Sequence, residues 1–444
     1  MSRASICAVA LSLIAALFCL AQAQTTAQPP ADFTGSSLFP LDGPGVRYTG
    51  VPATDPVAKL QRELESGTRK LTPDPKTGYL KPILEALRIP IDSQTLVFSK
   101  TSFQMNRIHP GNPRAIYFND DVYVGYVPGG DVVEISATDP VKGGIFYAIE
   151  QPSAASKPKL ARRDDCLQCH AAPRTLGIPG HIVRSVYPIA DGFAATNAPS
   201  YNTDHRSPFE RRFGGWYITG TTGDAKHMGN AIAADIDNPE KLDFDANRNW
   251  TTLEGHAAVD TRRYLSPHSD VVAHLVLSHQ TAGHNYLARA HYEAAQALAM
   301  QEDINRATNA PASQLSDSTV RRLDRAAEAL LRYFLFTTER KLSGPVAGSS
   351  TFTTTFAAAG PKDKKGRSLR DFDLQTRLFR YPLSFLIYSE AFDSLPDAVR
   401  IRFCQQLGNA LKTGEGAAVN LTPDQRQAIR EILIDTKPAL RAYL

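Results

Sequence analysis

The spacing of apolar residues along the chain changes near residue 265. From about residue 95 to 235, short β-branched and aromatic runs such as RAIYFNDDVYVGYV, DVVEISA and GIFYAIEQ are separated by Asn-Asp, Gly-Gly and Asp-Pro turns. Such runs are typical of short strands. From residue 269 onward, apolar residues recur at helical spacing. The pattern predicts an α+β protein with a β-rich N-terminal half and a mainly α-helical C-terminal half.

Six helices are expected from the same pattern. Two short amphipathic helices are predicted near residues 55–66 and 80–88, ahead of the strands. Thr422-x-x-Gln425 is a capping box, which marks the start of the last helix. The helices expected in the C-terminal half cover residues 269–302, 315–339, 394–412 and 423–435.

The first residues have the pattern of an export signal. Arg3 precedes an apolar run from Ile6 to Leu20, and Ala21-Gln22-Ala23 supplies small residues for cleavage. The run is shorter than the ~18 residues of a membrane span, and no later stretch reaches that length. We therefore expect residues 1–23 to be a signal peptide and the mature chain to be exported without a membrane span. The periplasm of a Gram-negative bacterium is the expected destination.

Composition and cysteine content narrow the class of protein. Of 444 residues, 42% are hydrophobic and 21% charged, as in ordinary globular proteins, and a net charge of +4 does not indicate a nucleic-acid partner. Without the predicted signal peptide the cysteines are Cys166, Cys169 and Cys404, so a disulfide framework is excluded. Cys404 lies in a helical pattern and is expected to be a core residue.

The two remaining cysteines belong to Cys166-Leu167-Gln168-Cys169-His170, a C-x-x-C-H motif. A zinc site would need a second cluster of Cys or His, and a thioredoxin-type dithiol belongs in a βαβ unit. Haem attachment needs two thiols, which add to the vinyl groups, and an adjacent histidine, which binds the iron. The motif favours one covalent haem c, with thioether bonds to Cys166 and Cys169 and with His170 as proximal iron ligand.

The residues after the motif differ from those of a small all-helical cytochrome c, where the motif ends the first helix. Here Pro173, Gly177, Pro179 and Gly180 predict a loop. We therefore expect a flexible lead-in over 24–50, a β-rich haem-binding region over 51–265 and a helical region over 266–444, and not the small cytochrome c fold.

Several longer blocks carry a wider resemblance. CLQCH, HRSPFERRFGGWYITGTTGDAKHMGN and GRSLRDFDLQTRLFRYPLSFLIYS, with RSVYPIADG and VLSHQTAGHNYLARAHYE, resemble a family of uncharacterised bacterial exported cytochrome-c-type proteins. The resemblance covers nearly the whole mature length. It implies haem binding and export, and it implies no substrate.

The haem face opposite His170 decides between two kinds of function. A methionine or histidine there makes an electron carrier, whereas an open face permits ligand binding or catalysis. Met228 follows His227 in a glycine-containing turn, 62 residues after Cys166. Met228 or His227 is therefore a candidate distal ligand, and core packing of both is the alternative.

Histidines of the helix expected at 269–302 suggest a second set of candidates. His279 lies on the apolar face, as a weaker distal candidate or as a hydrogen-bonded core residue. His279 and His284 are about 140° apart around a helix, so they cannot chelate one ion. His284 and His291 lie on the more polar side and are expected to be solvated.

The remaining candidates, for contacts with the haem propionates or with a redox partner, are basic residues near the motif and later in the chain. Haem propionates favour arginine, and Arg184, Arg211 and Arg212 are possible partners. A later basic run is either a docking patch for an acidic redox partner or a solvated loop. It comprises Lys362, Lys364, Lys365, Arg367 and Arg370.

Taken together, the residues predict a periplasmic haem protein that transfers electrons to or from a redox partner. One alternative is a haem-dependent oxidoreductase, in which the extra mass forms a pocket for a small-molecule substrate. A second alternative is a haem-based sensor or binding protein for a small ligand. The sequence has no recognisable acid-base constellation, so whether the protein is an enzyme stays open.

Overall fold

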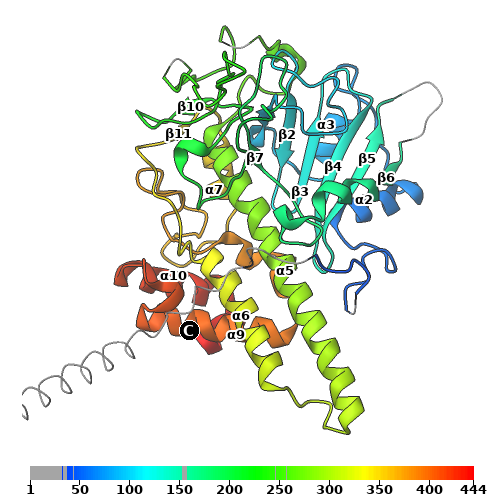
Figure 1. Ribbon diagram of the computed structural model, residues 1–444, viewed down its shortest axis with the longest axis vertical. Coiled ribbons are helices and arrows are strands. Elements are labelled where there is room, and N and C mark those ends of the chain that lie inside the picture. Colours follow the sequence, from blue (N-terminus) through cyan, green and yellow to red (C-terminus); the bar gives the residue numbers. More distant parts are fainter. Residues whose placement is uncertain (1–32, 34–37, 44, 153–157, 246, 257) are drawn as a thin grey trace, which may run out of the picture.

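The computed structural model describes residues 33, 38–43, 45–152, 158–245, 247–256 and 258–444. The predicted signal peptide, residues 1–23, lies outside them. A large antiparallel sheet forms in the N-terminal half, and most helices lie in the C-terminal half (Figure 1). The predicted α+β class is therefore confirmed.

The main sheet has seven strands in the order β6-β5-β4-β3-β2-β1-β9. Every neighbouring pair is antiparallel, so β1 to β6 form a meander and β9 joins its far edge. The strands are β1 (Thr95–Val97), β2 (Arg114–Phe118), β3 (Val122–Tyr126), β4 (Val132–Asp139), β5 (Gly143–Glu150), β6 (Leu160–Arg162) and β9 (Trp216–Tyr217).

The turn between β2 and β3 shows how the sequence directs the meander. The Asn119 side-chain oxygen accepts hydrogen bonds from the backbone N–H groups of Asp121 and Val122. An asparagine that bonds its own backbone in this way favours a tight turn. The Asp120-Asp121 pair is thus part of the turn, as its position at a strand boundary predicted.

The two faces of the sheet pack against different parts of the chain. Side chains on one face, including Tyr117, Val124 and Ile135, form a core with α2 (Pro56–Glu65) and α3 (Leu80–Ala86). Alternate side chains point to the other face because successive residues of a strand point to opposite sides. That second face meets the C-x-x-C-H segment and a long helix.

The long helix is α5 (Val271–Thr308), which runs along the molecule in Figure 1. Asp270 caps its start by accepting hydrogen bonds from Val272 and Ala273. The other helices are α4 (Leu167–His170), α6 (Asp317–Phe334), α7 (Phe352–Ala358), α8 (Glu390–Asp393), α9 (Asp397–Thr413) and α10 (Pro423–Thr436). The expected helices thus correspond to α2, α3, α5, α6, α9 and α10, and the capping box at Thr422 is present.

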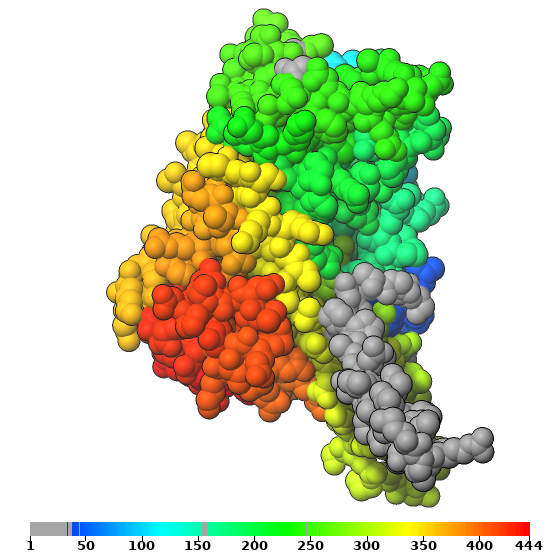
Figure 2. All heavy atoms as spheres, turned by 60° about the vertical axis from the view of Figure 1, so that its left-hand side comes forward, coloured from blue at the N-terminus to red at the C-terminus, as the bar shows by residue number. Residues whose placement is uncertain are grey.

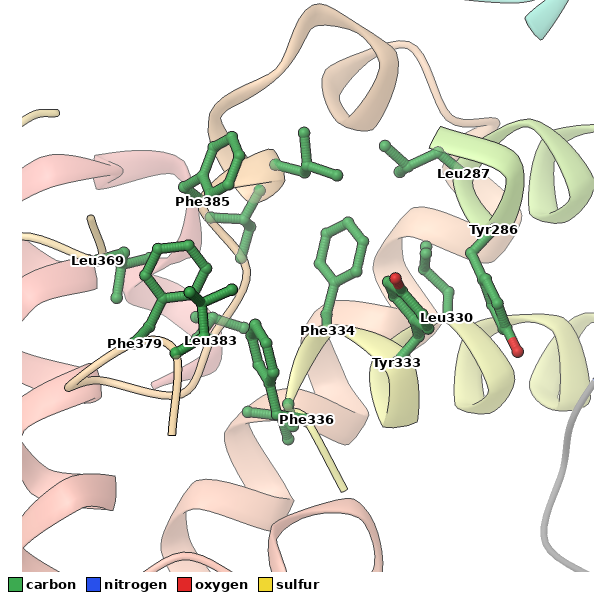
Figure 3. Close-up of a cluster of buried hydrophobic side chains, with 14 of the residues drawn as sticks. Tyr286, Leu287, Leu330, Tyr333, Phe334, Phe336, Leu369, Phe379, Leu383 and Phe385 are labelled. Atoms are coloured by element: carbon green, nitrogen blue, oxygen red, sulfur yellow. The ribbon is translucent and has the colours of Figure 1, made fainter. Parts of the chain in front are cut away.

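An aromatic core joins α5 and α6 to the later chain. In Figure 3, Tyr286 of α5, Tyr333 and Phe334 of α6, and the Phe379 and Phe385 rings lie in one cluster. The Tyr286 and Tyr333 rings stack with centroids 4.4 Å apart. The helical half is held mainly by this apolar packing.

The segment after the motif differs from the strand-rich prediction. Besides β9, its strands are β7 (Arg184–Ser185), β8 (Tyr201–Asn202) and β10 (Gly220–Thr221), each of only two residues. Glycines with left-handed backbone, such as Gly192 and Gly215, interrupt the extended runs. This largely irregular segment, green in Figure 2, covers one end of the molecule, away from the C-terminal helices.

The last described part of the expected lead-in is packed against the fold. Val46 and Tyr48 are buried, and Lys142 donates hydrogen bonds to the backbone oxygens of Arg47, Tyr48 and Val51. Since its backbone oxygens hold a buried ammonium group, the stretch 45–51 is anchored to the sheet. Among the described residues, none of the helices combines the length and apolarity needed to span a bilayer.

Candidate functional site

The C-x-x-C-H motif lies directly after the edge strand β6. A short 3-10 turn, Asp164–Cys166, leads into the single turn of α4. Both cysteines are free thiols, Cys166 half-buried and Cys169 exposed. Burial, followed by the charge of Asp165, raises the pKa of Cys166 to about 11, so this thiol is protonated at neutral pH. A redox dithiol depends instead on a cysteine with a lowered pKa, which Cys166 does not have.

His170 is held in one orientation by the loop that follows it. Its Nδ1 lies 2.9 Å from the backbone oxygen of Gly180, and the Gly180 N–H donates back to the His170 oxygen at 2.9 Å. A carbonyl oxygen only accepts, so Nδ1 carries the proton and Nε2 keeps its lone pair. Burial lowers the pKa of His170 and keeps the ring neutral. This is the arrangement of a metal-binding histidine whose second nitrogen is hydrogen-bonded.

Helix α5 in turn holds the loop that follows His170, through the side chain of Asn285. The Asn285 side chain accepts from the His181 N–H at 2.8 Å and donates to the His181 oxygen at 2.7 Å. A Cβ on Gly180 would lie 2.3 Å from the Asn285 oxygen, so only glycine allows this approach. The orientation of His170 is therefore fixed by a side chain 115 positions further along the chain.

A cavity of about 650 Å³ opens beside the motif. Cys166, Cys169 and His170 line one wall, and Phe146, whose ring is 4.6 Å from that of His170, lines part of the floor. The volume lies within the ~300–1,000 Å³ that is usual for cofactor sites. The apolar side chains that complete the lining include Val97, Phe103, Met105, Ile116, Ile182, Val183, Trp216 and Leu277.

An ion pair crosses the floor of the cavity. Arg114 of β2 reaches over β3 to Glu134 of β4, with its Nη2 2.8 Å from a carboxylate oxygen. The residue between them on β3 is Gly125, where a Cβ would lie 2.4 Å from the Arg114 guanidinium. The absence of a side chain at Gly125 is thus what lets the pair form. The strand register pairs Gly125 with both Ile116 and Glu134, a relation that the sequence alone did not reveal.

Basic residues line the cavity as well. Of the three predicted propionate partners, Arg184 lies in the lining, and Arg174 accompanies it. Both donate to the Ser200 hydroxyl, at 2.9 and 3.3 Å, and neither forms an ion pair with a carboxylate of the described residues. Burial, and then the nearby Arg174, lowers the pKa of Arg184. Two neighbouring guanidinium groups without an anion fit a carboxylate ligand.

The other two arginines predicted as propionate partners, Arg211 and Arg212, lie outside the cavity lining. Arg211 is exposed and stacks over the Tyr201 ring at 5.1 Å. Arg212 is buried and donates to the backbone oxygens of His205 and Ser207, which fixes a loop. Burial lowers the pKa of Arg212 to about 10. Neither residue lines the cavity.

Tyr123 and His181 of the cavity lining belong to a hydrogen-bonded network that continues behind the lining to Thr138 and His284. The Tyr123 hydroxyl and the Thr138 hydroxyl each lie 2.9 Å from His284 Nδ1, and Thr138 also lies 3.2 Å from His181 Nε2. Burial lowers the pKa of His284 to about 3, so the ring is neutral. His284 and His291 are both buried, and the expectation that they are solvated is wrong because α5 packs on both sides.

Met228 and His227 pack in the core and do not line the cavity. Met228 is fully buried, and its sulfur accepts a hydrogen bond from the Ser185 hydroxyl at 3.6 Å. His227 Nδ1 accepts from the Gly229 N–H. Of the two interpretations, core packing is the one that agrees with the structure.

His279 belongs to a separate buried cluster. Its Nδ1 lies 2.9 Å from His205 Nδ1, and its Nε2 lies 2.9 Å from the Ser384 hydroxyl. Both ring nitrogens are therefore engaged, and the side chain does not line the cavity. The hydrogen-bonded core interpretation agrees with these contacts.

Most of the later basic run is paired within the chain. Arg367 contacts Asp363 and Glu431, and Lys365 contacts Glu431 at 2.8 Å. Lys364 contacts Asp435, and Arg370 contacts Asp120. The run thus joins α10 and the β2–β3 turn to the rest of the molecule.

No family model, curated protein or solved structure matches the chain. The family resemblance of the sequence blocks stays a prediction. Among the described residues, no group of three or more His, Cys, Asp and Glu side chains is arranged to hold a metal ion.

Proposed function

We propose that the protein is a c-type cytochrome, with one haem joined to Cys166 and Cys169 by thioether bonds and with His170 as the proximal iron ligand. The observation that carries the proposal is the hydrogen bonding of the two ring nitrogens of His170. Its Nδ1 donates a hydrogen bond to the Gly180 oxygen, and its Nε2 has no partner among the described residues. His170 lines the same cavity as both thiols. These are the three groups that haem attachment needs, in one place.

The cavity fits the group in shape and charge. Its apolar lining suits a macrocycle, and its basic residues suit two propionates. Arg174 and Arg184 would hold the carboxylates, and Lys100 also lines the cavity. Phe146 would support the His170 ring from the floor.

We further propose electron transfer as the function, with a periplasmic redox partner. A bound haem would supply a one-electron couple. Cys169 is exposed, so a group attached to it would lie close to the surface, where electrons can pass to a partner. The export signal and the family resemblance support the periplasmic location.

A haem-dependent oxidoreductase is the second candidate. The polar inner end of the cavity, formed by Tyr123, Ser136 and His181, favours it. These side chains could hydrogen-bond a small substrate next to the haem. The two candidates differ in whether the iron has a free coordination position.

Haem attachment is tested with the exported chain produced in a host that matures c-type cytochromes. We expect colour that stays with the polypeptide on a denaturing gel and in acidified organic solvent. The double variant Cys166→Ser, Cys169→Ser should lose it completely, and Cys404→Ser, whose thiol is buried in the helical core, should keep it. Colourless wild-type protein, or colour that washes out, would contradict the proposal.

A further inference from the structure

The loop between β1 and β2 brings a methionine to the cavity. Met105 lies in this loop and lines the cavity together with Lys100 and Phe103. The backbone N–H of Met105 donates to the Ser102 oxygen, and the neighbouring Gln104 side chain donates to the Val132 oxygen at the start of β4. The loop is thus tied to β4 through Gln104, and a backbone hydrogen bond within the loop holds Met105.

Met105 and His170 reach the cavity from different edges of the sheet. The motif arrives from β6, which is one edge, whereas the loop leaves β1, next to the other edge. Between them the floor is formed by Arg114, Gly125 and Glu134 of the central strands. A flat group bound on this floor would have the motif on one side and the loop on the other.

Met105 is the one methionine of the described residues that lines the cavity. Its sulfur has no hydrogen bond among those residues, whereas the Met228 sulfur accepts from Ser185, and the Met300 sulfur lies 3.8 Å from Arg322. Met300 is near the distant end of α5. The only free thioether beside the motif is therefore that of Met105, within the part of the chain that the structure describes.

The other nitrogen ligands of the lining, besides His170, have partners. His181 has a hydroxyl near each ring nitrogen, Ser136 at 3.4 Å and Thr138 at 3.2 Å. The Lys100 ammonium lies over the Phe193 ring, 4.3 Å from its centroid. Thioether sulfur, by contrast, is a known axial ligand of haem iron and raises its reduction potential.

Apolar side chains at the mouth of the cavity are exposed to solvent. Phe103 is 59% exposed and Met105 is 43% exposed, both beside the motif. Large apolar side chains gathered at a cavity usually mark a binding site. A macrocycle against this wall would remove their surfaces from water, which favours its binding.

From these contacts we propose that Met105 is the distal iron ligand, opposite His170. The inference rests on the proposed haem attachment and sharpens it: the iron has six ligands from haem and protein, and the protein is an electron carrier whose iron is closed to small molecules. Met228, His227 and His279 then act only in packing.

The test compares Met105→Leu with Met300→Leu in the haem-loaded protein. Leucine keeps the size and apolarity of methionine, so the loop should keep its structure. We expect wild type and Met300→Leu to bind carbon monoxide weakly in the ferrous state. In Met105→Leu, carbon monoxide affinity should rise by about tenfold or more, the sulfur-to-iron absorption band of the ferric state should vanish, and the midpoint potential should fall.

Met105→His supplies the second measurement. Imidazole also binds haem iron, so this variant should exclude carbon monoxide again at a lower midpoint potential than wild type. If Met105→Leu has covalent haem and the wild-type spectrum, potential and carbon monoxide affinity, Met105 is not the ligand. If wild type itself binds carbon monoxide readily, the closed site is wrong. Both results leave haem attachment standing, whereas absence of covalent haem defeats the proposed function itself.

Discussion

Two histidines in different regions of this protein, the buried His279 of α5 and the half-buried His170 beside the cavity, differ in how their ring nitrogens are used. In α5 and around it, His279 has a partner at each ring nitrogen and is enclosed by aromatic rings. Beside the cavity, His170 has one nitrogen bonded to Gly180 and the other left without a partner. His279 thus contributes to packing, whereas His170 presents a free nitrogen to a cavity, where a ligand can bind.

The difference shows that burial and residue type together do not identify a ligand-binding histidine. What distinguishes His170 is its place at a cavity and a hydrogen bond that selects one tautomer. If the comparison is right, changes in the helical region should alter stability without altering the haem. Changes at the cavity should alter the haem spectrum or potential, with a smaller effect on stability.

The largest expected effect is in the helical core. Phe334 is fully buried, and its ring lies 5.8 Å from Phe403 and 6.2 Å from Phe392. Phe334→Ala should lower the free energy of unfolding by about 3–5 kcal/mol, because it leaves a cavity. Urea denaturation measures the loss, and the haem spectrum should be unchanged. Ile401→Ala, on the exposed side of α9, is the control and should cost less than about 0.5 kcal/mol.

The two histidines can be compared directly with His279→Gln and His170→Gln. Glutamine cannot bond both His205 and Ser384 in place of the ring, so His279→Gln should lower the free energy of unfolding by about 1–3 kcal/mol. Its haem spectrum should match wild type. His170→Gln should change the spectrum and midpoint potential with a smaller loss of stability. Equal effects of the two variants on the spectrum would erase the distinction between the regions.

Gly125→Ala tests the floor of the cavity. The new Cβ would meet the Arg114 guanidinium at 2.4 Å, so the arginine must move off Glu134. We expect a loss of about 1–3 kcal/mol from the crowding, together with a shifted midpoint potential. Gly50→Ala, where the nearest atom is 3.9 Å away, is the matched control. An unchanged potential in Gly125→Ala would mean that the ion pair does not act on the site.

The last expected effect is a pH dependence of stability. Burial lowers the pKa of His274, His279 and His284 from 6.5 to about 3. Between these values the unfolded chain binds protons that the folded chain does not, so the free energy of unfolding falls as pH falls below 6.5. Each histidine contributes up to about 1.4 kcal/mol per pH unit. Urea midpoints below pH 6.5 should therefore fall less steeply in His284→Gln than in wild type.

Local features of the site could be predicted from the sequence, and the relations between distant segments could not. The C-x-x-C-H spacing is local, and so are the helix periodicity and the Thr422 capping box. Arg184, predicted as a propionate partner because it follows the motif closely, lines the cavity beside the motif residues. Met228 and His227 had the right residue types, but nothing in the sequence showed that they pack in the core.

The floor of the cavity, by contrast, depends on the register of the sheet. Arg114 faces Glu134 only because Gly125 separates them on the strand between. Met105 lines the same cavity as the motif because the sheet brings the β1–β2 loop and the segment after β6 to one face. These relations join residues 20 positions apart, as for Arg114 and Glu134, or more than 60, as for Met105 and the motif. Periodicity along one segment contains no information about them.

Helix α5 has one more consequence, for attempts to divide the protein. Its 38 residues span about 57 Å at 1.5 Å each. Asn285 holds the loop after the motif, while Glu293 pairs with Arg322 of α6, so this one helix contacts both regions. A fragment that ends before residue 266 would lose the anchor of its His170 loop, and the remainder would expose the helix face that the sheet covers. We therefore expect neither piece to be made as a stable protein on its own.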